Sequence, residues 1–200
     1  SAPPVTIRHM LTHTSGIGEA KSLNELIGGV LLNLSSEKIK PGDPITPLAE
    51  YYNGVLRPDV FPEEKWAYAN HAFSTLGQLI EDVSGEPFPE YMLNHVFEPL
   101  GMFKTDYLFS SRVRDGLAQG YEAKKGKLQP AEFYEFADLG AGSVYSSVNE
   151  MALYLAALMN GGKNSHGSVL NPETLKFMMT PQYQQDPHLA AMGLGFMLEN

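Results

Sequence analysis

Apolar residues recur at helical spacing through much of this 200-residue chain, and glycine, proline and capping residues interrupt the pattern. The clearest stretch begins at Asn70 and ends before Gly85. Its apolar stripe consists of Phe73, Leu76, Leu79, Ile80 and Val83. Because a glycine just after the last periodic residue commonly ends a helix, we predict a helix over 70–84 that packs on a core through this stripe.

Several further segments carry helix signals. Thr6 is placed to cap a short helix that stops at Gly16. Two longer helices begin with a capping box, Ser22-x-x-Glu25 and Ser147-x-x-Glu150, and Asn171 precedes a proline as helix starts often do. The predicted segments are 6–16, 22–34, 48–55, 89–98, 147–160 and 171–178. The predicted inward residues of the 147–160 helix are Met151, Tyr154, Leu155 and Leu158.

Strand signals are few. Residues 120–131, "GYEAKKGKLQPA", predict a hairpin with Gly126 in its turn, and residues 190–200 predict a strand. A helical pattern starts at Val5 with no preceding element, and the chain ends in the predicted strand. We therefore expect residues 1–200 to form a single partial domain that is mainly α with a few short strands.

Composition excludes several classes of protein. The formal net charge of −9 argues against nucleic acid as a partner, because phosphate backbones require basic patches. The most apolar run, Leu26 to Leu34, is too short and too interrupted to span a membrane. The absence of cysteine excludes disulfides, thiolate metal sites and a cysteine nucleophile. An apolar content of 43% is that of a globular chain.

Three short patterns match those of penicillin-recognising serine hydrolases, namely Ser-x-x-Lys, Tyr-x-Asn and Lys-x-Gly. They occur here as Ser35-Ser36-Glu37-Lys38, Tyr68-Ala69-Asn70 and Lys124-Lys125-Gly126. Patterns with two defined residues often arise by chance. The first ends a helix in a polar stretch, and the third belongs to a hairpin turn. We therefore interpret the Ser35 and Lys124 patterns as solvated surface.

Two histidines and a serine near the N-terminus are candidate site residues. His9 and His13 are four residues apart, a spacing that suits a metal pair on one helix face. No glutamate lies between them and no third ligand suggests itself, which favours a structural pair with one ring bonded to backbone groups. Ser15 lacks the preceding glycine of a nucleophile elbow, so we interpret it as a turn serine. We expect no metal and no cofactor.

Three longer strings are more specific than any of these patterns. They are "VTIRHMLTHTSGI" (5–17), "EKWAYANHAFSTLGQLIEDVSGEPFPEYMLNHVFEPLGMFKT" (64–105) and "GAGSVYSSVNEMALYLAALMNGG" (140–162). Together, in this order and spacing, they resemble the serine β-lactamase-related family. That family includes class C β-lactamases, DD-peptidases, D-aminopeptidases and similar esterases.

The resemblance implies a fold and two site residues. The fold is the α+β β-lactamase/transpeptidase-like fold, of which this chain would be the helical region, with most of the sheet missing and 190–200 as one of its strands. Tyr68 matches the catalytic tyrosine that activates the serine and protonates the leaving group, and Asn70 matches the asparagine that binds the acyl side of the substrate. The family's Ser-x-x-Lys and Lys-Thr-Gly or His-x-Gly segments would lie before Ser1 and after Asn200.

Some positions depart from the family pattern. Glu63 stands where relatives often have glycine, which leaves the conformation of that turn in question. Ser143 replaces another frequent glycine, and Glu150 replaces a frequent aspartate.

The implied function is hydrolysis of a β-lactam, a D-residue peptide or a small ester through an acyl-enzyme, with this chain inactive by itself. Two alternatives stay open: a non-catalytic sensor or binding module on the same scaffold, and a helical interaction domain. The resemblance favours an exported or periplasmic bacterial location. Apolar surface left exposed where the sheet would pack favours self-association.

Overall fold

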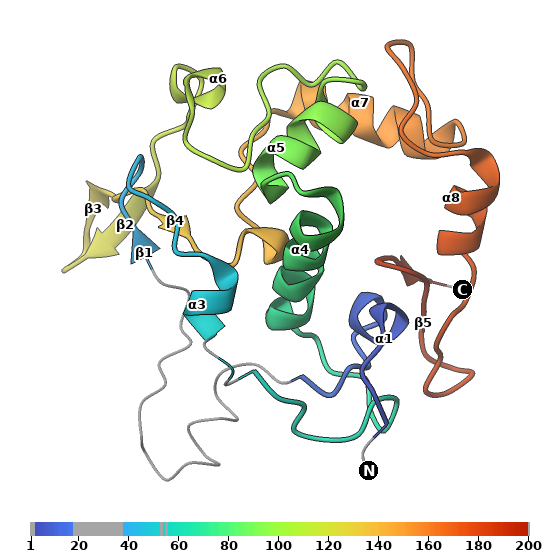
Figure 1. Cartoon of the computed structure of the whole chain (residues 1–200). Helices are drawn as coiled ribbons and strands as arrows, with labels where there is room; N and C mark the ends of the chain where they lie inside the picture. The colour runs from blue at the N-terminus through green and yellow to red at the C-terminus, as the bar shows by residue number, and fades with distance from the viewer. Residues whose placement is uncertain (1–2, 18–37, 53, 55, 200) are drawn as a thin grey trace, which may run out of the picture.

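The computed structural model describes residues 3–17, 38–52, 54 and 56–199. Its regular elements are mainly helices, and helix α4 (Asn70–Ser84) lies at its centre (Figure 1). Three short helices contact α4, namely α1 (Ile7–Leu11), α3 (Leu48–Tyr52) and α5 (Phe88–Met92). The predicted class, mainly α with a few short strands, is confirmed. The helix predicted at 22–34 and the Ser35 pattern's serine lie outside the described residues.

Helix α4 spans Asn70–Ser84, and Gly85 adopts the left-handed conformation (φ 74°) predicted for a glycine stop. The predicted apolar stripe is wrong in part, because Val83 is 80% exposed. The buried face instead carries small or polar residues: His71, Ala72, Ser74 and Gly77. A Cβ on Gly77 would lie 3.3 Å from the Cα of Gly140 in the short helix η2 (Leu139–Ala141). Small side chains on α4 therefore allow η2 to lie directly against it.

Helix α1 is shorter than predicted. Thr6 caps it as expected, since its hydroxyl accepts from the His9 N–H while Nδ1 of His9 accepts from the Thr6 N–H. The helix ends at Leu11 rather than near Gly16, and residues 12–17 continue as a buried turn. Hydroxyl side chains in this turn bond to the backbone and compete with further helix.

The main hydrophobic core lies between α4 and the segments that follow it. Helix α5 continues into a π-helical turn, Leu93–Phe97, and together they occupy the segment predicted as a helix at 89–98. The buried members of this core are Phe88, Phe97, Leu100, Met102, Tyr107, Leu139 and Ala157. A smaller core between α1 and α4 consists of Met10, Ile17, Ala69 and Ala72.

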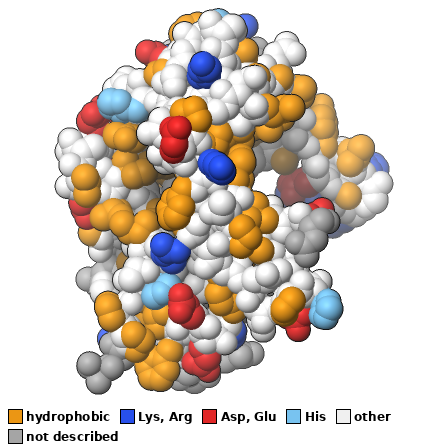
Figure 2. Space-filling model, turned by 90° about the vertical axis from the view of Figure 1, so that its right-hand side faces the viewer, with side chains coloured by type: hydrophobic (Ala, Val, Ile, Leu, Met, Phe, Trp, Pro, Cys, Tyr) orange, Lys and Arg blue, Asp and Glu red, His pale blue; other side chains and the backbone are white. Residues whose placement is uncertain are grey.

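Helices α7 (Val148–Met159) and α8 (Pro172–Met178) follow. Ser147 and Asn171 cap them as predicted. The predicted inward face of α7 is wrong in part. Exposed apolar residues recur at helical spacing along α7, and we call this set the α7 stripe: Val148, Met151, Leu155 and Met159. Figure 2 views the molecule from the side of α8 and shows hydrophobic side chains spread between isolated charges.

The strands pair in three antiparallel ladders within the described residues. These are β1 (Lys38–Ile39) with β4 (Glu135–Phe136), β2 (Tyr121–Lys124) with β3 (Lys127–Pro130), and β5 (Ala191–Met192) with β6 (Met197–Leu198). The predicted hairpin at Gly126 is confirmed: Lys125 and Gly126 have φ values of 52° and 75°, as a two-residue type I′ turn requires. Residues 190–199 contain two short strands that pair with each other rather than one strand. No described helix is long and apolar enough to cross a membrane.

Candidate active site

Tyr68 and Asn70 flank the start of α4. Ala69 is fully buried and occupies the N-cap position in extended conformation, so Asn70 is the first helical residue rather than the cap. The Tyr68 side chain is 55% exposed. The buried Ala69 therefore holds the backbone in place beside Tyr68, while Tyr68 itself stays accessible to solvent.

The ring of His13 packs against the segment that carries Tyr68 and Asn70. Its centroid lies 4.5 Å from that of Tyr68, 4.8 Å from that of Phe73 and 5.9 Å from that of Trp66. Its Nδ1 accepts a hydrogen bond of 3.1 Å from the backbone N–H of Ala69. This contact requires an unprotonated Nδ1. It confirms the prediction that one histidine ring of the His9/His13 pair bonds to a backbone group.

Backbone hydrogen bonds strengthen the same connection. The Ala67 N–H donates to the carbonyl of His13 at 2.9 Å, and the Glu63 N–H donates to the carbonyl of Thr14 at 2.8 Å. His13 itself has a left-handed backbone (φ 57°) and is 8% exposed. The "HTSG" string therefore acts as a buried support for the tyrosine segment. The sequence did not predict this positioning role of His13, because no sequence pattern links His13 to Tyr68, which lies 55 positions later.

His9 and His13 do not form a pair on one helix face. Helix α1 ends before His13, so the two rings do not share a helix face. The Nε2 of His9 lies 3.4 Å from Oε1 of Glu63 instead. Within the described residues there is no cluster of three or more potential metal ligands. Ser15 is buried and its Oγ accepts from the Ile17 N–H, which confirms it as a turn serine.

The Lys124 pattern lies on the surface, as interpreted. Lys124 is exposed in the β2–β3 hairpin and forms an ion pair with Glu122. Figure 1 shows this hairpin at the edge of the molecule, away from α1 and the start of α4. The structure therefore does not bring Lys124 together with Tyr68 and Asn70.

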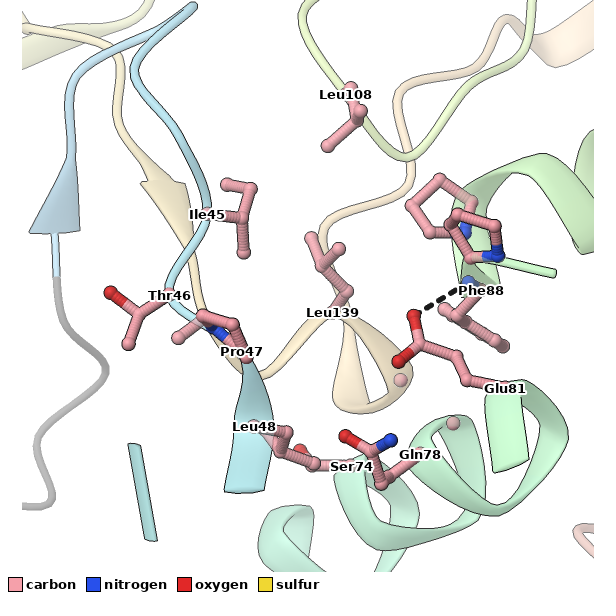
Figure 3. A pocket seen from close by; sticks show the side chains of 15 residues that line it. Ile45, Thr46, Pro47, Leu48, Ser74, Gln78, Glu81, Phe88, Leu108 and Leu139 are labelled. Atoms are coloured by element: carbon pink, nitrogen blue, oxygen red, sulfur yellow. Dashed lines mark hydrogen bonds between the residues drawn. The ribbon is translucent and has the colours of Figure 1, made fainter. Parts of the chain in front are cut away.

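A cavity of about 300 Å³ runs along α4, beginning one helical turn beyond Asn70 (Figure 3). Its walls come from the segment before α3, from α4, from the start of α5 and from η2. Side chains labelled in Figure 3 point into it from opposite sides, among them Ile45, Gln78, Phe88 and Leu139. Asn70, Ser74 and Gln78 are spaced four residues apart, so the cavity and Asn70 lie on the same face of the helix.

The electrostatics at Tyr68 are sparse. Among the described residues, no hydrogen bond to its hydroxyl is present. A phenol can act as a base near neutral pH only where neighbouring cations favour its ionised form. No cationic side chain among the described residues is hydrogen-bonded to the Tyr68 hydroxyl.

Comparison with known proteins finds relatives of this chain among penicillin-binding proteins and carboxypeptidases. A putative penicillin-binding protein PbpX of Bacillus subtilis (strain 168) is 31% identical over 159 residues, which cover 78% of this chain and 36% of that protein. A putative D-alanyl-D-alanine carboxypeptidase of Escherichia coli (strain K12) is 24% identical, over 95% of this chain and 46% of that protein. The chain spans less than half the length of these relatives.

A solved structure shows the same fold. The octameric penicillin-binding protein homologue from Pyrococcus abyssi superposes with a TM-score of 0.70 and 27% identity, over 97% of this chain and 43% of that chain. The fold is therefore that of the β-lactamase/transpeptidase-like proteins. The family model described as Beta-lactamase matches residues 1–200. The chain belongs to the Beta-lactamase family.

Proposed function

We propose that this chain contributes Tyr68 and Asn70 to the active site of a serine hydrolase that cleaves β-lactams, D-residue peptides or small esters. The observation that carries the proposal is the exposed Tyr68 residue on a backbone segment that His13 holds in place. Preorganised, accessible side chains of this kind are what catalytic residues need. Family membership supports the reaction class.

The nucleophile of the proposed reaction is a serine outside residues 1–200. Tyr68 takes the hydroxyl proton as the serine oxygen attacks the substrate carbonyl. The same proton then passes to the leaving amine or alkoxide, and an acyl-enzyme remains. Water then attacks the acyl carbonyl while Tyr68 takes its proton, and that proton passes to the serine oxygen as the acyl–serine bond breaks. Asn70 offers one acceptor and two donors, which suits an amide beside the reacting carbonyl.

We propose that the 200-residue chain by itself is inactive. Ser15, in the "HTSG" string, is 1% exposed, and its Oγ accepts a hydrogen bond from the Ile17 N–H within a turn. The α7 stripe also leaves apolar side chains in water, which is typical of a surface that another segment or chain covers. We further propose that this surface drives self-association of the isolated chain, which light scattering would detect as a mass above 22.0 kDa.

The test uses the full-length gene product with a chromogenic cephalosporin and p-nitrophenyl acetate as substrates. Tyr68→Phe keeps the ring against His13 and removes the hydroxyl. Loss of general acid–base catalysis is expected to lower kcat by roughly 10²–10⁴-fold. The matched control, Tyr121→Phe in the exposed β2–β3 hairpin, should leave kcat unchanged.

Two results would contradict the proposal. Full activity in the Tyr68→Phe variant would remove the tyrosine from the mechanism. A full-length product that binds a labelled penicillin but turns over neither substrate would favour the non-catalytic sensor or binding module. Turnover by the 200-residue chain alone would refute its proposed inactivity.

A further inference from the structure

We propose that the cavity along α4 binds a neutral, mainly apolar substituent of the substrate. The inference rests on the proposed function, because it assigns the acyl group of the substrate to Asn70. The volume of about 300 Å³ is at the lower end of the range of ligand pockets. It suits a short alkyl or aryl group rather than a whole large ligand.

The cavity is preformed, because its walls have little freedom to move. Pro47, Pro87 and Pro89 line it, and each has a restricted backbone. The base is held by the close contact of η2 with α4: a Cβ on Gly140 would lie 2.6 Å from the carbonyl oxygen of Phe73. Preformed apolar pockets bind apolar groups without the cost of ordering loops.

The charge of the lining selects against anions. Glu81 is acidic, and none of the lining side chains that the structure describes is basic. Its Oε1 accepts a hydrogen bond of 2.7 Å from the Phe88 N–H, which holds the carboxylate at the cavity wall (Figure 3). A ligand carboxylate in this cavity would meet a like charge with no counter-ion. The cavity therefore favours a neutral group.

Gln78 supplies a neutral polar contact in a cavity that is lined mainly by apolar residues. Its Nε2 donates to Oδ1 of Asp82 at 3.0 Å, which orients the amide. Its carbonyl oxygen makes no hydrogen bond within the described part of the chain and can accept one from a ligand N–H. An amide attached to a short apolar chain satisfies both the apolar lining and this acceptor.

The cavity is positioned for a substituent of a substrate held at Asn70. Ser74 lines it, and the Ser74 hydroxyl donates to the Asn70 carbonyl at 3.2 Å. One helical turn, about 5.4 Å along the axis, separates the two residues. A substrate whose acyl group contacts Asn70 could therefore extend its side chain along α4 into the cavity.

The first test measures binding to the 200-residue chain by NMR, with hexanamide and hexanoate as neutral and anionic probes of equal chain length. Hexanamide should shift the Gln78 side-chain amide signals and the Gly77 and Gly140 backbone signals. Hexanoate should bind roughly fivefold more weakly, the effect of one like-charge contact in a hydrated site. Equal affinities, or shifts confined to other parts of the chain, would overturn the inference.

Two variants localise the effect. Leu48→Trp places a larger side chain in the cavity. Hexanamide can then bind only if the tryptophan ring moves aside, so its affinity should fall at least roughly tenfold. Glu81→Gln keeps an oxygen for the Phe88 N–H and removes the charge, so the hexanamide preference should disappear. The matched control is Leu189→Trp, which adds the same ring at a second cavity beside Trp66. An equal loss of binding in this control would count against the assignment.

The second test separates this inference from the proposed function. In the full-length gene product, Leu48→Trp should lower the ratio of kcat/KM for p-nitrophenyl hexanoate to that for p-nitrophenyl acetate. An unchanged ratio in an active enzyme would refute the link between the cavity and the substrate. A full-length product with no hydrolase activity that still binds hexanamide at Gln78 would refute the proposed function and leave the binding site in place.

Discussion

The imidazole of His13 lies against the phenol ring of Tyr68, with ring centroids 4.5 Å apart and planes inclined by 32°. One side chain is 8% exposed and the other 55% exposed, so a buried group supports a surface group. The Nδ1 of His13 also accepts from Ala69, the residue between Tyr68 and Asn70. The position of both candidate site residues therefore depends on a histidine in the buried turn that follows α1.

Replacing His13 should destabilise the fold. His13→Ala leaves the buried Ala69 N–H without its acceptor and opens a void among three aromatic rings. The lost hydrogen bond and the void together should lower the free energy of unfolding by about 3 kcal/mol. Urea denaturation of the 200-residue chain measures this change.

A conservative variant and a surface control frame that result. His13→Asn keeps an oxygen acceptor and tolerates the left-handed backbone, so it should lose clearly less stability than His13→Ala. His95→Ala removes a half-exposed histidine paired with Glu86 and should leave the denaturation midpoint nearly unchanged. Equal losses at His13 and His95 would contradict the supporting role.

Glycine at two left-handed positions should stabilise the protein. Glu63 and Ser143 have φ values of 66° and 69°, a region that favours glycine. The ion pair of Glu63 with His9 adds little, because the Glu63 side chain is 59% exposed to water. Glu63→Gly and Ser143→Gly should each raise the free energy of unfolding by about 0.5–1 kcal/mol, measured by thermal or urea denaturation.

The sign of this effect depends on the backbone conformation. Ala152→Gly, at an exposed position inside α7, provides the opposite case and should lower stability by about 1 kcal/mol. A loss of stability in both Glu63→Gly and Ser143→Gly would show that their side chains outweigh the backbone term.

Removal of the buried Glu150 carboxylate should separate α7 from the segment before α6 (Ser111–Arg114). Its Oε1 accepts from the Lys104 N–H at 2.8 Å and its Oε2 from the Thr105 hydroxyl at 2.5 Å. Glu150→Ala leaves the Lys104 N–H without its acceptor, whereas the Thr105 hydroxyl keeps Ser146 Oγ as a partner at 2.8 Å, so the change should cost about 2 kcal/mol of unfolding free energy. Glu150→Gln keeps one acceptor oxygen and should cost less, whereas Glu90→Ala at an exposed site should change the midpoint little.

Alkaline pH should destabilise the main core through Tyr107. Burial raises the pKa of Tyr107 to about 12, whereas an unfolded tyrosine has a pKa of about 10. The folded state therefore disfavours the ionised phenol. The Tyr107 contribution is complete below pH about 10 and is lost as the pH rises towards about 12, at a slope of about 1.4 kcal/mol per pH unit.

Urea denaturation at pH 9 and pH 11 isolates this contribution in Tyr107→Phe. The variant should lose about 1.4 kcal/mol less stability between the two pH values than the parent chain. Burial also raises the pKa of Tyr154, so a smaller alkaline loss should remain. Tyr121→Phe, on the exposed hairpin, should behave like the parent, and the same behaviour in Tyr107→Phe would contradict the assignment.

Local signals predicted the elements well, whereas packing decided which faces are buried. Thr6, Ser147 and Asn171 each cap the helix that they were predicted to cap. Periodicity alone predicted the buried faces of α4 and α7 only in part. On α4, the close approach of η2 requires small residues on the buried face, and Val83 is exposed. Capping involves neighbours within four residues, while burial depends on segments far away in the sequence.

The candidate site divides in the same way. The strings around Tyr68 and Asn70 identified the family without reference to coordinates, and they predicted these two residues as members of the site. Only the tertiary structure showed that His13 holds the tyrosine segment and that a cavity lies along α4, beginning one helical turn beyond Asn70. The sequence determined the starts of the capped helices, the glycine stop of α4 and the family, because these depend on local chemistry and on strings of residues. Side-chain contacts between distant segments decided the support of Tyr68, because they exist only once the chain has folded.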